Sequence, residues 1–123
     1  MKYMILIHSN PQSREIWDGF TDAQRADGYK EYAALGEDLT ASGELIVAEA
    51  LADASLSKRI PATEDLAIPS DGPFAEAKEL LAGFFLIECD GIDRAMEIAG
   101  RIPEAPLGLV EVRPIMDLSS YDV

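Results

Sequence analysis

One histidine stands among the side chains that could move a proton near neutral pH. His8 follows the apolar run of residues 3–7 and is the only histidine in the chain. An imidazole has an unperturbed pKa of about 6.5, so His8 has the chemistry of a general base. A histidine at the end of a strand can also be an ordinary hydrogen-bonded residue. The sequence leaves both roles open.

A second candidate group lies in residues 70–79, which read SDGPFAEAKE. If Asp71 or Glu76 entered an apolar cavity, loss of hydration would raise its pKa toward the range useful for proton transfer. Lys78 could hold a substrate oxyanion or pair with a neighbouring glutamate, and Phe74 could contact an apolar ligand. We therefore take Asp71 as a catalytic candidate and the other three as substrate-binding candidates. Asp, Gly and Pro are also ordinary turn residues, so a purely structural turn remains the alternative.

Two further polar side chains are candidates because of where they fall in periodic segments. Tyr29 and Tyr32 lie three residues apart and share one helix face, where core packing is the ordinary role. The hydroxyl of Tyr32 could instead donate a hydrogen bond to a carbonyl or phenolate oxygen. Arg113 alternates with valines, so it shares the opposite sheet face with Glu111. A buried arginine needs a carboxylate, which either Glu111 or a bound ligand could supply.

The composition excludes several classes of function. One histidine and one cysteine, Cys89, cannot form a zinc, copper or iron site, and we expect neither a metal nor another cofactor. Ten Lys and Arg residues against 23 Asp and Glu give a net charge of −13, which repels nucleic acid. Apolar runs fall well short of the roughly 20 residues of a membrane span. The first residues also lack the apolar length of a signal peptide, so we expect a cytoplasmic protein.

The first half of the chain predicts a strand over residues 2–8 and then a helix that begins after Thr21. Gln24, three residues on, completes a capping box with Thr21, and Gly43 ends the helix as a left-handed cap. Between strand and helix, residues 10–20 read as a long loop anchored by its aromatic side chains, Trp17 and Phe20. The apolar stripe expected along one face of the helix consists of Tyr29, Tyr32, Gly36 and Leu39.

The second half predicts strands over residues 45–51, 84–88 and 109–115. A helix is expected from Asp90 to Pro103, with an insertion at 53–82 between the second and third strands. The insertion carries the DGPF motif. Within it we expect a hairpin of residues 58–62 and 66–70 and a short helix over residues 76–81. The order β-α-β-β-α-β predicts a single α+β domain over 1–123: a ferredoxin-like antiparallel sheet with two helices on one face. The stripe expected on the last helix consists of Ile92, Ala95, Met96, Ala99 and Ile102.

The strands are apolar on both faces, as in residues 5–7, 45–47 and 84–87. An antiparallel sheet with one face in water alternates apolar and polar residues, and two helices cover only one face. The simplest cover for the other face is the same sheet of a second copy. Burial alone therefore predicts a homodimer.

Four stretches resemble the DGPF group of YCII-related proteins: SDGPFAEAKE with the LLAGFFLI that follows it, the opening MKYM and the closing VEVRP. The resemblance implies a dimeric α+β barrel in which two ferredoxin-like sheets face each other. Some relatives use a histidine–aspartate pair for acid–base chemistry on small cyclic or aromatic substrates. The corresponding positions here hold Tyr32 and Ile102, so neither member of that pair is present. The resemblance nevertheless implies that Tyr32 faces the cleft.

Two functions follow as expectations. The first is a small cofactor-independent enzyme, lyase-like or isomerase-like, that uses acid–base chemistry on a small cyclic or aromatic molecule. Its catalytic candidates are His8, Tyr32 and Asp71. The second is a non-catalytic module that binds a small molecule or regulates a partner, because DGPF-type proteins are associated with sigma-factor systems.

Overall fold

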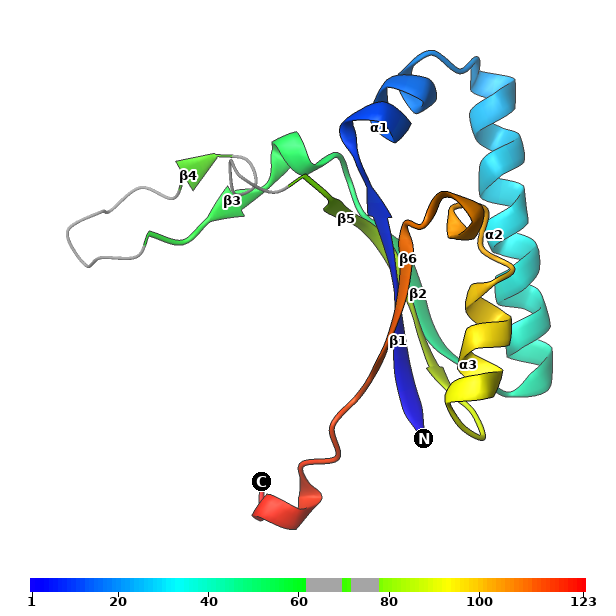
Figure 1. Cartoon of the computed structure of the whole chain (residues 1–123), viewed down its shortest axis with the longest axis vertical. Helices are drawn as coiled ribbons and strands as arrows, with labels where there is room; N and C mark the ends of the chain where they lie inside the picture. Colours follow the sequence, from blue (N-terminus) through cyan, green and yellow to red (C-terminus); the bar gives the residue numbers. More distant parts are fainter. Residues whose placement is uncertain (62–69, 72–77) are drawn as a thin grey trace.

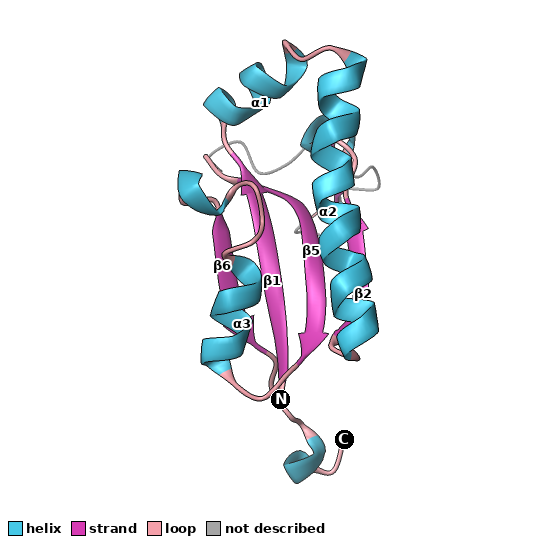
Figure 2. Ribbon diagram, turned by 90° about the vertical axis from the view of Figure 1, so that its right-hand side faces the viewer, coloured by secondary structure: helices cyan, strands magenta, loops and turns pink. Residues whose placement is uncertain are grey.

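The fold has two layers, a four-stranded antiparallel sheet and a layer of helices on one of its faces (Figures 1 and 2). The computed structural model describes residues 1–61, 70–71 and 78–123, with backbone alone at 70 and 71. The described elements are β1 (Lys2–Ser9), α1 (Pro11–Asp18), α2 (Asp22–Ser42), β2 (Leu45–Ala50), η1 (Ala54–Leu56), β3 (Lys58–Arg59), β4 (Ser70–Asp71), β5 (Leu80–Glu88), α3 (Ile92–Ala99), η2 (Ala105–Leu107), β6 (Val110–Pro114) and η3 (Ser119–Tyr121).

The strand order in the main sheet is β2-β5-β1-β6. Taken with α2 and α3, this order is the ferredoxin-like arrangement that the sequence predicts. All three strand pairs are antiparallel, and Ile5 of β1 lies opposite both Phe85 of β5 and Val112 of β6. The outer position of β6 accommodates Pro114, because an edge strand loses least from a missing backbone donor.

The core lies between the sheet and the helices. Alternate residues of β1, namely Tyr3, Ile5 and Ile7, are buried against the helices, whereas Met4 and Leu6 face the other side. We call that other side the open face of the sheet. The remaining buried core side chains are Leu35, Leu39, Phe85, Ile87, Cys89, Ala95, Ile98, Ala99, Ile102 and Leu109.

The long helix α2 begins and ends where the local signals place it. Thr21 Oγ1 accepts the Gln24 amide at 3.2 Å, and Gln24 Oε1 accepts the Thr21 amide at 2.8 Å. This reciprocal pair satisfies two backbone donors that the first turn leaves unpaired. Gly43 ends the helix with φ of 80°, in the left-handed region that glycine adopts without strain.

Residues 11–18 form a helix, α1, so the prediction of a loop there is wrong. Asn10 caps α1 by accepting the Ser13 amide at 2.7 Å, and Pro11 occupies the first helical position. The aromatic anchors expected for the loop do pack as anchors. The Trp17 ring lies 5.9 Å from Phe20 and 5.3 Å from Tyr29, measured between centroids.

The insertion differs from the prediction at its end. Leu80 and Leu81 begin β5, which starts four residues earlier than expected, so the helix predicted over 76–81 is wrong at these residues; residues 76 and 77 lie outside the described residues. A short hairpin does form, with β3 paired to β4 through Lys58↔Asp71 and Arg59↔Ser70. Most of the expected second hairpin strand, residues 66–69, lies outside the described residues.

The second-half helix, α3, is shorter than predicted. It begins after Gly91 rather than at Asp90, and it ends at Ala99, ahead of Pro103. Ile98 is buried, whereas Ile92 and Met96 of the expected stripe are 46% and 57% exposed. The buried stripe is therefore rotated toward Ala95, Ile98 and Ala99.

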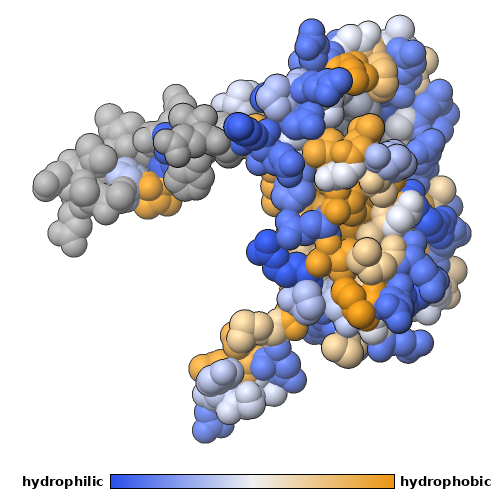
Figure 3. Space-filling view, in the orientation of Figure 1, coloured by the Kyte–Doolittle hydropathy of each residue, from blue (hydrophilic) through white to orange (hydrophobic). Residues whose placement is uncertain are grey.

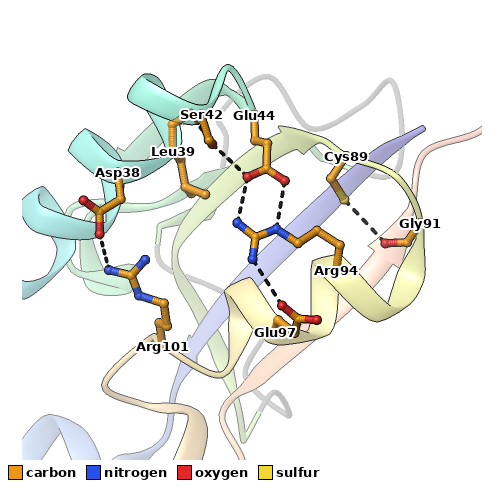
Figure 4. Close-up of polar contacts among 9 residues, drawn as sticks. All are labelled: Asp38, Leu39, Ser42, Glu44, Cys89, Gly91, Arg94, Glu97 and Arg101. Carbon is orange, nitrogen blue, oxygen red and sulfur yellow. Dashed lines mark hydrogen bonds and ion pairs between the residues drawn. The ribbon is translucent and has the colours of Figure 1, made fainter.

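Ion pairs join α3 to the end of α2 and the start of β2 (Figure 4). Arg94 donates from Nε and Nη2 to the two carboxylate oxygens of Glu44, at 2.9 and 2.8 Å, and a third nitrogen reaches Glu97 at 3.2 Å. Arg101 donates to Asp38 at 2.6 Å. These contacts fix the two helices against each other on the sheet.

Two segments extend from the sheet on the side away from the helices (Figure 1): the β3–β4 hairpin and residues 115–123. The second of these carries Met116, Leu118 and Tyr121, which are 70%, 48% and 68% exposed. In the described part of the chain, no helix has the length and apolar character needed to cross a membrane.

Candidate functional site

A cavity of about 890 Å³ lies between α1, α2 and one end of the sheet. The end of β1, the end of β2 with the segment that follows it, and the start of β5 form one wall. The aromatic side chains Trp17, Tyr29 and Tyr32 project from the helices on the other side. A space of this size holds a small organic ligand, since such sites commonly measure about 300–1,000 Å³.

A tyrosine–glutamate pair lies in the cavity wall. The Tyr32 hydroxyl on α2 donates a hydrogen bond to Oε1 of Glu104, which comes from the segment between α3 and η2. Both side chains are about half-buried, and burial is the main cause that raises the pKa of each. For Tyr32, the hydrogen bond to Glu104 raises the pKa further, so its hydroxyl stays protonated and acts as a donor.

The second oxygen of the same carboxylate is left open. Glu104 Oε2 is buried and has no hydrogen-bond partner among the described residues. A buried polar atom without a partner is costly and therefore uncommon in a native protein. Glu104 is also one of the residues that line the cavity, so the unpaired oxygen belongs to a side chain beside the space that a ligand would occupy.

The helix face that carries Tyr32 serves two purposes. Toward the end of α2, Leu35 and Leu39 are buried in the core. On the same helix, Tyr29, Tyr32 and Gly36 line the cavity. The predicted apolar stripe is therefore divided between core and cavity, and only its last member, Leu39, is fully a core residue.

The helix α1 contributes four residues to the cavity lining: Ser13, Arg14, Trp17 and Asp18. Trp17 contacts Tyr29 edge to face, and a Cβ at Gly28 would lie only 3.3 Å from the Trp17 ring. Arg14 of α1 donates to both carboxylate oxygens of Asp53 at 2.8 Å, and both residues line the cavity. Hydrogen bonds from Ser55, and then from Arg14, lower the pKa of Asp53 to about 2. This ion pair joins α1 to the segment after β2.

His8 lies at the end of β1, where it borders the cavity and also reaches the open face. Its Nε2 lies 3.1 Å from Glu111 Oε1, and Arg113 donates to Glu111 Oε2 at 2.9 Å. The hydrogen bond to His8, followed by that to Arg113, lowers the pKa of Glu111. Glu111 thus connects the two candidates. Arg113 itself is exposed and lies outside the cavity lining.

The structure describes only some of the site candidates from the insertion. Phe74 and Glu76 lie outside the described residues, and of Asp71 only the backbone is described, paired with Lys58 in the hairpin. Lys78 is exposed and is not among the described residues that line the cavity.

Neither Glu104 nor Arg14 was predicted from the sequence as a site residue. Glu104 had a usable signal, because it follows by two residues the position that the family resemblance assigns to an aspartate, Ile102. Ile102 itself is buried in the core. Within the described ranges, the structure contains no group of three or more His, Cys, Asp or Glu side chains arranged to hold a metal.

Comparison with known proteins places the chain in a family. The model of the YCII-related domain matches residues 1–119. The chain belongs to the YCII-related family. An uncharacterised protein of Rhizobium meliloti (strain 1021), R00369, is 28% identical over 117 residues, which cover 94% of this chain and 92% of that protein.

A solved structure shares the fold of this YCII-family chain. It is the 5-chloro-2-hydroxyhydroquinone dehydrochlorinase of Burkholderia phenoliruptrix AC1100, in complex with 2,5-dihydroxybenzoquinone. The match has a TM-score of 0.52 at 19% identity and covers 94% of each chain. At this identity, the likeness establishes the fold.

Proposed function

We propose that this YCII-family protein is a small enzyme that catalyses acid–base chemistry, of the lyase or isomerase kind, on a small cyclic or aromatic molecule. The observation that carries the proposal is the Tyr32–Glu104 pair in the cavity wall, with Glu104 Oε2 buried and unpartnered. The shared fold of a dehydrochlorinase that binds a dihydroxylated ring supports the choice of substrate class.

Glu104 is the proposed proton-transfer group. Its raised pKa brings the carboxyl closer to neutral pH, where a general acid or base works best. In the reaction, Oε2 takes a proton from a C–H or O–H group of the ligand and returns it at another atom of the ligand. This transfer needs no cofactor, because no net electrons move.

Tyr32 is the proposed positioning residue. Its hydroxyl occupies Oε1 of Glu104, so Oε2 is the oxygen left for the ligand. His8, which also lines the cavity, is a second proton carrier within this proposal. Arg113 acts on the site indirectly, because it donates a hydrogen bond to Glu111, and Glu111 contacts His8. The roles of Asp71, Phe74, Glu76 and Lys78 stay predictions.

A homodimer is part of the same proposal. On the open face, Ile46 and Val47 of β2 are 46% and 37% exposed, and apolar side chains of β1 and β5 continue the patch. Figure 3 shows apolar side chains gathered over the sheet between the two projecting segments. Residues 115–123 extend apolar side chains on that same side. A second copy would cover both surfaces with matching apolar area.

The oligomeric state can be measured directly by light scattering after size-exclusion chromatography. We expect twice the monomer mass for the native chain and a monomer for Leu86→Glu, whose change lies on the open face. Glu37→Gln, on the exposed side of α2, is the control and should leave the mass unchanged. A native chain that is monomeric at 100 µM or so would contradict the dimer.

The catalytic proposal is tested by thermal-shift screening against aromatic, phenolic and lactone compounds. A ligand at 100 times its dissociation constant adds about 2.7 kcal/mol of stability, which such a screen detects. Hits are then incubated with the protein in D2O, where nuclear magnetic resonance follows proton exchange and conversion. We expect Glu104→Gln to abolish exchange, Tyr32→Phe to weaken it, and Glu37→Gln to leave it unchanged.

Two other results of this experiment would contradict parts of the catalytic proposal. Hits that bind the protein without exchange or conversion would favour the small-molecule-binding or regulatory module over the enzyme. Exchange that persists in Glu104→Gln would overturn the assignment of Glu104 as the proton-transfer group.

A further inference from the structure

Gly36 lies in the interior of α2, where glycine is the least favourable residue after proline. Packing does not account for it. A Cβ at Gly36 would meet no atom within 4 Å. By contrast, a Cβ at Gly28 would press on Trp17 at 3.3 Å, and one at Gly83 would lie 2.9 Å from the backbone oxygen of Glu49. Contacts explain those two glycines and leave Gly36 unexplained.

The space beside Gly36 belongs to the cavity, because Gly36 is one of the residues that line it. It lies one helical turn after Tyr32 and on the same face. A side chain on a helix covers the turn that precedes it, so a larger residue at position 36 would extend toward Tyr32 and Glu104. The strands β2 and β5 also contribute small residues to the lining, namely Ala48, Ala50 and Gly83, beside larger ones such as Leu81 and Phe84.

We propose that Gly36 is a specificity-determining residue, whose missing side chain makes room for the body of the ligand beside Glu104. This inference rests on the proposed function. An apolar cavity of about 150 Å³ suffices for benzene, so a space of about 890 Å³ holds a ligand larger than one ring. The ligand class is therefore an uncharged, ring-containing molecule with a second ring or comparable substituent that lies against α2 at Gly36.

Charge supports an uncharged ligand. Arg14 is the one Lys or Arg among the described residues lining the cavity, and Asp53 already neutralises it. Glu104 and Asp18 also border the space. An anionic ligand would meet carboxylates without a free cation among these residues, whereas an uncharged phenol can donate its hydroxyl to Glu104 Oε2.

The test uses two probes of different size, phenol and 2-naphthol, and dissociation constants measured by ligand-observed nuclear magnetic resonance. We expect Gly36→Leu to raise the dissociation constant of 2-naphthol at least tenfold and that of phenol less than threefold. Gly36→Ala should have a smaller effect on 2-naphthol and should raise the melting temperature. Ala34→Leu adds the same side chain on the exposed side of α2, outside the described lining, and should change neither constant.

The outcomes separate this inference from the function on which it rests. If Gly36→Leu binds 2-naphthol as tightly as the native chain does, or loses affinity for both probes equally, the proposed role of Gly36 in ligand size selection is overturned. If the native chain still exchanges a proton of a bound ligand in that case and Glu104→Gln does not, the proposed function stands. Failure of the native chain to bind either probe would count against the ring-binding cavity itself, and with it against the role of Gly36.

Discussion

Tyr32 and Glu104, 72 residues apart in the chain, form one hydrogen-bonded pair in the wall of the cavity. The sheet and the packing of α2 bring them together, since neither residue has a local reason to meet the other. The pair ties the segment after α3 to the middle of α2, so it bears on stability as well as on chemistry.

The first prediction concerns the hydroxyl of this pair. Tyr32→Phe removes the donor and leaves Glu104 Oε1 half-buried without its hydrogen bond. We expect the free energy of unfolding at pH 7 to fall by about 1 kcal/mol, the low end for an unsatisfied buried group because water reaches a half-buried carboxylate. Urea unfolding measures the loss. Tyr29→Phe removes a hydroxyl from a side chain that is 54% exposed, and it should change stability much less. Equal losses in the two variants would contradict the assignment.

The second prediction concerns the proton on Glu104. Burial raises the pKa of this carboxyl in the folded chain above its ordinary value of 4.5. The folded state then keeps a proton that the unfolded chain has released, so stability falls as pH rises from about 4.5 through the folded-state pKa. Glu104→Gln lacks this titration. Relative to the native chain, its stability should therefore increase with pH across that window and level off above it.

Urea unfolding at intervals between pH 4 and 8 measures this trend. Glu37→Gln makes the same chemical change at an exposed position of α2 and serves as the control. A stability difference between Glu104→Gln and the native chain that does not vary with pH would show that the folded chain does not hold the proton.

The third prediction uses two glycines with opposite surroundings. Gly83→Ala would place a Cβ 2.9 Å from the backbone oxygen of Glu49, on the neighbouring strand β2. A strand backbone cannot move aside as the end of a side chain can, so we expect the free energy of unfolding to fall by about 1–3 kcal/mol. Gly36→Ala meets no atom within 4 Å and should gain roughly 0.5–1 kcal/mol from helix propensity. Chemical denaturation gives the change in the free energy of unfolding for each variant. Changes of the same sign in both would be inconsistent with this packing.

The contrast between α2 and Glu104 shows what the sequence could and could not predict. The limits of α2 follow from local chemistry: Thr21 with Gln24 at one end, Gly43 at the other. A capping box is complete within four residues, so no knowledge of the rest of the fold is needed. The Tyr32–Glu104 contact depends on how α3 and the segment after it pack, and sequence spacing carries no information on that.

Helix α1 had a local signal that its composition obscured. Asn10, Pro11 and Ser13 mark a helix start, but only Ile16 and Trp17 in the helix are large apolar residues. A helix of eight residues with so few large apolar side chains, and with no fully buried residue, offers too few positions for an apolar repeat to be recognised. Its stability comes from the cap and from the contact of Trp17 with Phe20 and Tyr29, which is tertiary.

The fourth prediction concerns the ion pair between Glu44 and Arg94. Hydrogen bonds from Arg94, and then from Ser42, lower the pKa of Glu44 from 4.5 to about 2. A depressed folded-state pKa contributes stability that is fully present above about pH 4.5 and is lost as pH falls toward 2. Glu44→Gln removes this contribution. The native chain should therefore be more stable than the variant at pH 7, and the difference should shrink on acidification.

Melting temperatures of both proteins between pH 7 and 2.5 give the comparison. Other carboxylates also titrate in this range, so the informative quantity is the difference between the two curves, in which their contributions cancel. Glu37→Gln makes the same chemical change at an exposed position of α2 and serves as the control. Salt provides an independent check, because an ion pair at the protein surface weakens when 1 M NaCl screens it, whereas a neutral hydrogen bond does not. If the Glu44→Gln difference survived both acid and salt, Glu44 would stabilise the chain through packing, and Arg94 would not be its essential partner.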